Sequence, residues 1–140
     1  MDFAFDTVAV TPETGGAVAP ELIRILGDRI RPVVPKQDQQ PPQVIVDILS
    51  EGREKSVVGT NSSGQVREFQ LRLRVKFRMR TPQGRILIAE TEVAQQRDIS
   101  FSEAAVLSKE AEETLLYRDM QSDIVQQLLR RMAAVKILSP

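Results

Sequence analysis

Residues 66–80 alternate apolar and basic side chains along most of their length. Successive side chains of a β-strand point to opposite faces, whereas a helix would spread the same cations around its circumference, so the spacing predicts a strand. Its apolar face is formed by Phe69, Leu71, Leu73, Val75, Phe77 and Met79. Its other face, the cationic stripe, carries Arg72, Arg74, Lys76, Arg78 and Arg80. The apolar face must pack against another layer, and the stripe must meet water or a complementary surface.

The composition limits what the chain can bind and catalyse. Lys+Arg and Asp+Glu are balanced at 19 each, so no overall positive field gathers polyanions. The absence of Cys and His removes disulfides, metal sites built on either residue, and catalysis by either residue. No apolar run approaches the roughly 20 residues that span a bilayer. We therefore predict one domain over residues 1–140, with no metal site or cofactor, and the composition leaves open only catalysis by Ser, Lys or carboxylates.

The periodicity predicts an α+β fold in the order strand, helix, three strands, helix. The segments are residues 3–10, 20–31, 44–58, 66–80, 85–97 and 100–138, with a bulge in the second strand near Gly52. Residues 32–42 contain four prolines and form an extended connection. Ser100 and Glu103 fit a capping box for the long last helix. Two amphipathic helices covering one face of a four-stranded, mostly antiparallel mixed sheet give a two-layer sandwich.

The turn after the cationic stripe predicts a register. Pro82-Gln83-Gly84 suits a three-residue hairpin loop that closes with Thr81 opposite Arg85. On the basic face, this register sets Arg74 opposite Glu92 and Lys76 opposite Glu90. On the apolar face, it pairs Met79 with Leu87, Phe77 with Ala89 and Leu73 with Val93. Arg72, Arg78 and Arg80 are left without an obvious partner, and Ile86 and Ile88 fall on the basic face.

Three functional readings stay open from the residues alone. Charge runs most often form a solvated face. Arg outnumbers Lys four to one in the stripe, which suits bidentate recognition of carboxylate or phosphate. Nucleic-acid binding is the third reading, but the balanced charge and the lack of aromatic side chains among the basic positions disfavour it. No motif supports an enzyme that uses Ser or carboxylates, so we predict no catalytic residues.

Three segments of the last helix resemble the C-terminal helix of the LptE family of lipopolysaccharide-assembly lipoproteins, also called rare lipoprotein B. They are AVLSKEAE at 105–112, LLYRDM at 115–120 and QQLLRRM at 126–132. Glu68-Phe69-Gln70 at the head of the third strand agrees too, as does the order of elements, so the resemblance covers nearly the whole chain.

The resemblance implies a non-enzymatic protein of the Gram-negative outer membrane. Such proteins are held to its periplasmic face by a lipid on an N-terminal cysteine, a residue that this chain lacks. They sit as a plug inside the LptD β-barrel, help it fold, and with it insert lipopolysaccharide into the outer leaflet. The implied partners are therefore LptD and lipopolysaccharide, with no nucleic acid.

The resemblance also points to site residues. Lys109 matches the lysine of a Leu-x-Lys-acid segment implicated in lipopolysaccharide binding. The family's basic residue near the tip of the loop between the second and third strands is absent here, and Arg67 is the nearest cation. We expect lipopolysaccharide to be contacted by Lys109, Arg67, Arg72, Arg78 and Arg80. We expect Arg74 and Lys76 to face the partner.

Overall fold

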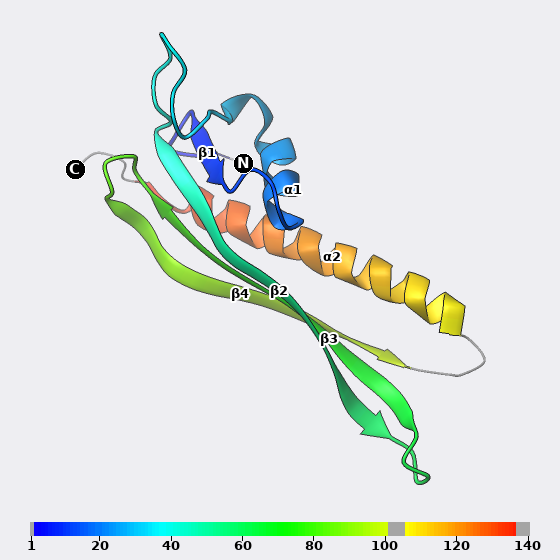
Figure 1. Cartoon of the computed structure of the whole chain (residues 1–140). Coiled ribbons are helices and arrows are strands. Elements are labelled where there is room, and N and C mark those ends of the chain that lie inside the picture. Colours follow the sequence, from blue (N-terminus) through cyan, green and yellow to red (C-terminus); the bar gives the residue numbers. More distant parts are fainter. Residues whose placement is uncertain (1, 101–105, 137–140) are drawn as a thin grey trace.

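Two helices lie on one face of a twisted four-stranded sheet in the computed structural model, which describes residues 2–100 and 106–136 (Figure 1). A single 3-10 turn, η1 (Gly27–Arg29), follows the first helix. The elements are β1 (Val8–Thr11), α1 (Val18–Leu26), β2 (Val44–Thr60), β3 (Val66–Arg80), β4 (Ile86–Ser100) and α2 (Val106–Ala133). The predicted order and the α+β sandwich are confirmed.

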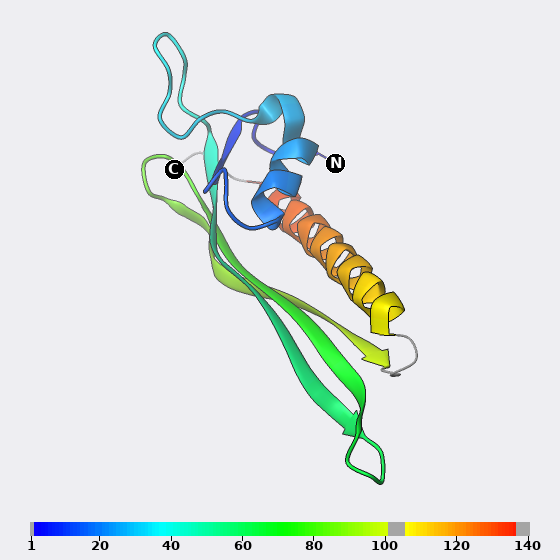
Figure 2. The ribbon, with the colours of Figure 1, turned by 45° about the vertical axis from the view of Figure 1, so that its right-hand side comes forward.

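The sheet has the strand order β1-β2-β3-β4. β1 runs parallel to β2, and the other two pairs are antiparallel, so the predicted mixed sheet is confirmed. β2 and β3 form a long hairpin that reaches past the first described turn of α2 (Figure 2). Residues 32–42, between η1 and β2, contain no helix or strand.

The core lies between the helices and the apolar face of β3. Leu71, Leu73, Val75, Phe77 and Met79 are all buried on that face. Against it, α2 packs side chains spaced four residues apart, which fall on one face of a helix. These are the fully buried Met120, Ile124, Leu128 and Met132, and α1 adds Leu22 and Leu26. This packing leaves the cationic stripe on the opposite face.

The predicted turn is confirmed, but the predicted register holds only beside it. The Thr81 N–H donates to the Arg85 carbonyl at 2.9 Å, and Gly84 has the left-handed φ of 98°. Irregularities between Arg80 and Phe77 then shift the ladder by two residues. The five predicted strand pairs are therefore wrong. The observed pairs are Arg74 with Ala94, Lys76 with Glu92, Met79 with Ile88, Phe77 with Thr91 and Leu73 with Gln95.

The shift has a physical reason. The predicted register left Ile88 on the basic face, whereas the observed one sets it across from the buried Met79 and packs it against the core. A shift of two residues also keeps every later side chain on its predicted face, because the side-chain period of a strand is two. Ile86 stays on the basic side, opposite Arg80, and is 52% exposed.

The first elements start and stop at other residues than predicted. β1 begins at Val8, because Phe3 and Phe5 precede the strand as a stacked ring pair with centroids 4.8 Å apart. α1 begins at Val18, before the predicted start, because Glu51 of β2 caps it. The Glu51 carboxylate accepts from the N–H groups of Ala17 at 2.8 Å and Val18 at 2.9 Å. The α-helix ends before Gly27, earlier than predicted.

Further differences from the prediction lie later in the chain. The β2–β3 ladder has three irregularities; the one before Gly52 lies between Ile48 and Ser50, and the other two lie between Val57 and Thr60. Ser100 pairs with Glu68 as the last residue of β4, and the rest of the predicted capping box, Glu103 included, lies outside the described residues. α2 ends at Ala133, short of residue 138. The Ala134 N–H is shared there between the carbonyls of Arg130 at 3.1 Å and Arg131 at 3.3 Å, which tightens the last turn.

Candidate functional site: a cationic stripe and a lysine pocket

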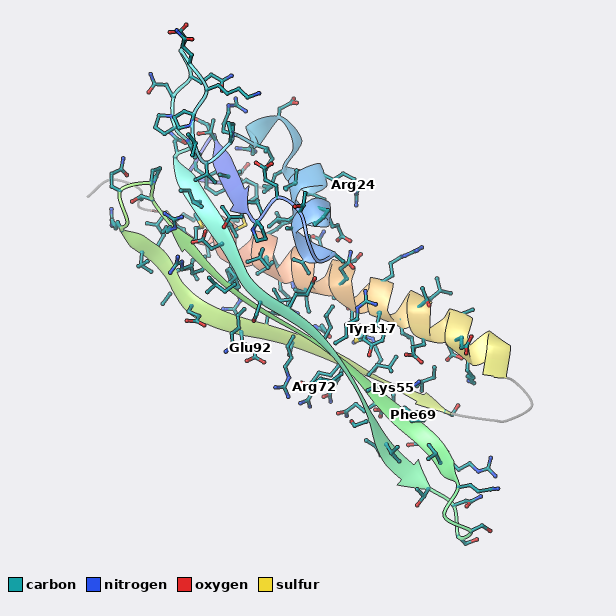
Figure 3. All side chains as sticks on the ribbon, viewed as in Figure 1. Arg24, Lys55, Phe69, Arg72, Glu92 and Tyr117 are labelled. Atoms are coloured by element: carbon teal, nitrogen blue, oxygen red, sulfur yellow. The ribbon has the colours of Figure 1, made fainter. Side chains whose placement is uncertain are left out.

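The cationic stripe lies on the open face of the sheet, as predicted. Figure 3 shows Arg72 and Glu92 on the face away from α2, whereas Lys55, Phe69 and Tyr117 lie on the side of the helix. The burial pattern of β3 agrees, because its apolar side chains from Leu71 onward are buried and its basic ones are partly or fully exposed. The remaining question is whether those cations are available to a ligand.

Arg78 and Arg80 share one carboxylate, which sequence reasoning missed. Their Nε atoms donate to Oδ2 of Asp47 on β2, at 2.7 and 2.8 Å. The Thr11 hydroxyl donates to the other oxygen at 2.6 Å. Burial alone would raise the pKa of the Asp47 carboxyl, but the hydrogen bonds from Arg80, Thr11 and Arg78 outweigh it and hold the pKa below its ordinary value.

In the middle of the stripe, only Arg74 has carboxylate partners among the described residues. Arg74 lies between Glu54 of β2 at 3.5 Å and Glu92 of β4 at 3.7 Å. The contact with Glu92 is diagonal, since Lys76 is the residue directly opposite it. Arg72 donates to the Gln96 side-chain oxygen at 2.9 Å. Among the described residues, none forms an ion pair with Lys76. Carboxylates of the two neighbouring strands therefore neutralise part of the stripe's positive charge.

Lys109 and Arg67 lie away from the stripe. Lys109 is on α2, and its ammonium pairs with Glu112 at 2.9 Å. It lines a pocket of about 110 Å³ between the start of the helix and the sheet, here called the lysine pocket. The lining is formed by Lys55, Phe69, Ile99, Ser100, Lys109, Glu110 and Glu113. Arg67, near the end of the β2–β3 hairpin, donates to the Gln65 side chain at 3.1 Å. The predicted site residues thus divide between two surfaces.

Lys55 is the second cation of the lysine pocket, and sequence reasoning missed it. Its ammonium lies 4.5 Å from the centroid of the Phe69 ring and pairs with Glu113 at 2.8 Å. A cation over an aromatic face is attracted by the ring quadrupole. The signal was present in the sequence, because Arg53 and Lys55 are two residues apart and so share a strand face, as the cations of the stripe do.

Tyr117 extends this surface along α2. Its hydroxyl donates to the Glu54 carbonyl at 2.9 Å, and the Arg53 guanidinium lies 4.7 Å from the centroid of its ring. Burial, followed by the nearby Glu113 carboxylate, raises the pKa of the Tyr117 hydroxyl. The phenol is therefore a neutral donor that ties α2 to β2.

The arrangement suits binding. The pocket is lined by two ammonium groups and by the apolar side chains of Phe69 and Ile99. Such a lining can bind an anion that is joined to a hydrocarbon group. Within residues 2–100 and 106–136, no three acidic side chains cluster as metal ligands would. No helix in the same ranges is both long and apolar enough to cross a membrane.

Comparisons with known proteins agree on a single family. The sequence model of the family described as LptE, lipopolysaccharide-assembly, matches residues 5–132. The solution structure of an uncharacterized lipoprotein B from Nitrosomonas europaea is 36% identical in sequence, with a TM-score of 0.77, and the match covers 93% of this chain and 83% of that one.

Two more distant crystal structures share the fold. The rare lipoprotein B from Shewanella oneidensis is 19% identical, with a TM-score of 0.68 and with 91% of this chain and 92% of that one covered. A minor lipoprotein from Acinetobacter baumannii is 18% identical, with a TM-score of 0.69 and with 95% and 94% covered. No curated protein sequence matches the chain.

Proposed function

The chain belongs to the LptE family of lipopolysaccharide-assembly proteins, and we propose that it is a non-enzymatic component of the outer-membrane lipopolysaccharide translocon. In this role it is the plug and assembly partner of the LptD β-barrel, and it binds lipopolysaccharide for insertion into the outer leaflet. A lipid on the full-length protein holds it at the periplasmic face of the outer membrane.

The lysine pocket is the observation that carries the lipopolysaccharide part of this proposal. The lipid portion of lipopolysaccharide joins phosphate groups directly to acylated sugars, so its ligand site needs cations beside apolar surface. Lys55 and Lys109 supply the cations, and Phe69 and Ile99 supply the apolar surface. Lysine binds phosphate as a compact point charge, which suits a pocket built from two different elements.

Replacing Lys109 with glutamine is expected to weaken lipopolysaccharide binding by about tenfold or more, since tenfold is the lower end of the loss for one charge-assisted hydrogen bond. The pair Lys55→Gln and Lys109→Gln should lose more. Titration of the purified protein with detergent-solubilised lipopolysaccharide measures both. Lys136→Gln removes the same charge beyond the far end of α2, where the side chain is exposed, and is the matched control. Equal affinities for the Lys109 and Lys136 variants would exclude the pocket as the binding site.

The cationic stripe supports the barrel part of the proposal. On this polar face, basic residues of β3 lie beside acidic residues of β2 and β4. Arg74, for example, lies between Glu54 and Glu92. A face of this kind suits hydrated, charged surroundings such as the polar lumen of an outer-membrane barrel. We therefore assign the stripe to the barrel and the lysine pocket to lipopolysaccharide.

A triple serine variant of Arg72, Arg74 and Lys76 is expected to fold but to co-purify with its barrel at a clearly reduced yield. Arg78 and Arg80 are left in place because they hold the buried Asp47. The control variant replaces three exposed cations on the helices, Arg24, Arg118 and Arg130, with serine. Equal recovery of barrel with the two triple variants would contradict a barrel-facing stripe.

A further inference from the structure

Both cations of the lysine pocket are occupied by carboxylates of the same helix. The Lys109 ammonium lies 2.9 Å from a Glu112 oxygen, and the Lys55 ammonium lies 2.8 Å from a Glu113 oxygen. Glu110 also lines the pocket, but no ion pair joins it to another described residue. The three acidic side chains outnumber the two lysines, so the pocket and its rim carry one net negative charge.

We propose that Glu112 and Glu113 are built-in counter-ions that set the affinity of the pocket. An anionic lipid headgroup binds there by taking Lys109 from Glu112 and Lys55 from Glu113. This inference rests on the proposed function, because it concerns the same pocket and the same class of ligand, a phosphorylated glycolipid.

The geometry makes the competition direct. Glu112 is three residues from Lys109 on α2, so helix geometry places its carboxylate beside the ammonium. Such tethering gives a competing group an effective concentration in the millimolar range, which a free ligand must overcome. A phosphate monoester can do so, because it carries a charge of about −1.5 to −2 and three acceptor oxygens against the single charge of a carboxylate.

The fold does not depend on these two ion pairs. The Glu112 side chain is 46% exposed and that of Lys55 is 42% exposed, so each pair includes one partner that water can solvate. Exposed pairs of this kind contribute little to stability, and their removal leaves a folded protein. Weak binding also suits a protein that must pass its ligand on, because a site that held the headgroup tightly would slow its release.

The experiment compares the wild-type protein with the double variant Glu112→Gln, Glu113→Gln. The probe is lipid A with two phosphate monoesters, presented in detergent micelles, and the reference is the same lipid after removal of both phosphates. The double variant is expected to bind the phosphorylated probe about four- to 25-fold more tightly, since each of the two exposed ion pairs that it removes accounts for about a two- to fivefold change. Its binding of the dephosphorylated lipid should stay unchanged.

Glu110→Gln is the matched control, because it removes the same charge from the same pocket without breaking an ion pair. It separates direct competition from a general change in charge, and its expected gain is smaller than that from either Glu112→Gln or Glu113→Gln alone. The inference is overturned if the double variant binds the phosphorylated probe no better than wild type, or if Glu110→Gln gains as much as the single variants. A different result would contradict the proposed function: the wild-type protein would bind the phosphorylated and the dephosphorylated lipid with equal affinity.

Discussion

Replacing Leu128 with alanine is expected to lower the free energy of unfolding by about 2–5 kcal/mol, the range for truncating a large buried aliphatic side chain. Leu128 is fully buried on the face of α2 that packs against the sheet. Its neighbours one turn away, Ile124 and Met132, are also fully buried, so neither can move into the space without leaving a cavity of its own. Urea denaturation followed by circular dichroism measures the change.

Leu115→Ala on the same helix is the matched control. The Leu115 side chain is 60% exposed, so the same truncation there should change stability by less than about 0.5 kcal/mol. A loss below about 1 kcal/mol for Leu128→Ala would mean that α2 does not pack on the sheet with this face.

The elements and their faces were predictable because the relevant information is local. The two-residue period of β3 and the four-residue spacing along α2 each define an apolar face without reference to the rest of the chain. The register between β3 and β4 was not predictable in this way. The turn closes as its residues dictate, but the two irregularities beside it, between Arg80 and Phe77, are decided by the burial of Ile88 against the core, which is a tertiary contact.

The candidate site was less predictable, because its contacts join distant parts of the chain. Asp47 and Arg78 are 31 residues apart, and Lys55 and Glu113 are 58 apart. The first contact could be found only from the pairing of β2 with β3. Three irregularities in that ladder shift any register counted back from the loop between Thr60 and Val66. Lys109 was predicted as a site residue from the family resemblance alone, because a single lysine near the start of a helix does not by itself indicate a binding site.

Replacing Asp47 with asparagine is expected to cost about 1–3 kcal/mol at neutral pH. The change removes the buried charge that both Arg78 and Arg80 contact, and an amide would offer them a donor where they need an acceptor. The expected loss is smaller than the roughly 3–5 kcal/mol for breaking a fully buried pair. The reason is that the Arg78 and Arg80 side chains are 40% and 25% exposed and can regain part of their hydration.

The dependence of this loss on pH follows from the lowered pKa of Asp47. A carboxyl whose pKa is lower in the folded than in the unfolded protein stabilises the fold above its unfolded pKa of about 3.9, and the contribution disappears as the pH falls through the folded value. The difference in unfolding free energy between wild type and Asp47→Asn should therefore be constant from neutral pH to about pH 5 and should shrink below about pH 4.

Urea denaturation of both proteins at pH 7, 5 and 3 tests this dependence, with Asp98→Asn as the control. Asp98 is an exposed carboxylate of β4 whose side chain joins no other described residue in an ion pair, so the same chemical change there should cost less than about 0.5 kcal/mol at every pH. A cost for Asp47→Asn that is as small as the control, or that is unchanged between pH 7 and pH 3, would mean that the two arginines do not depend on this carboxylate. The stripe end at Arg78 and Arg80 would then be held by the sheet backbone alone.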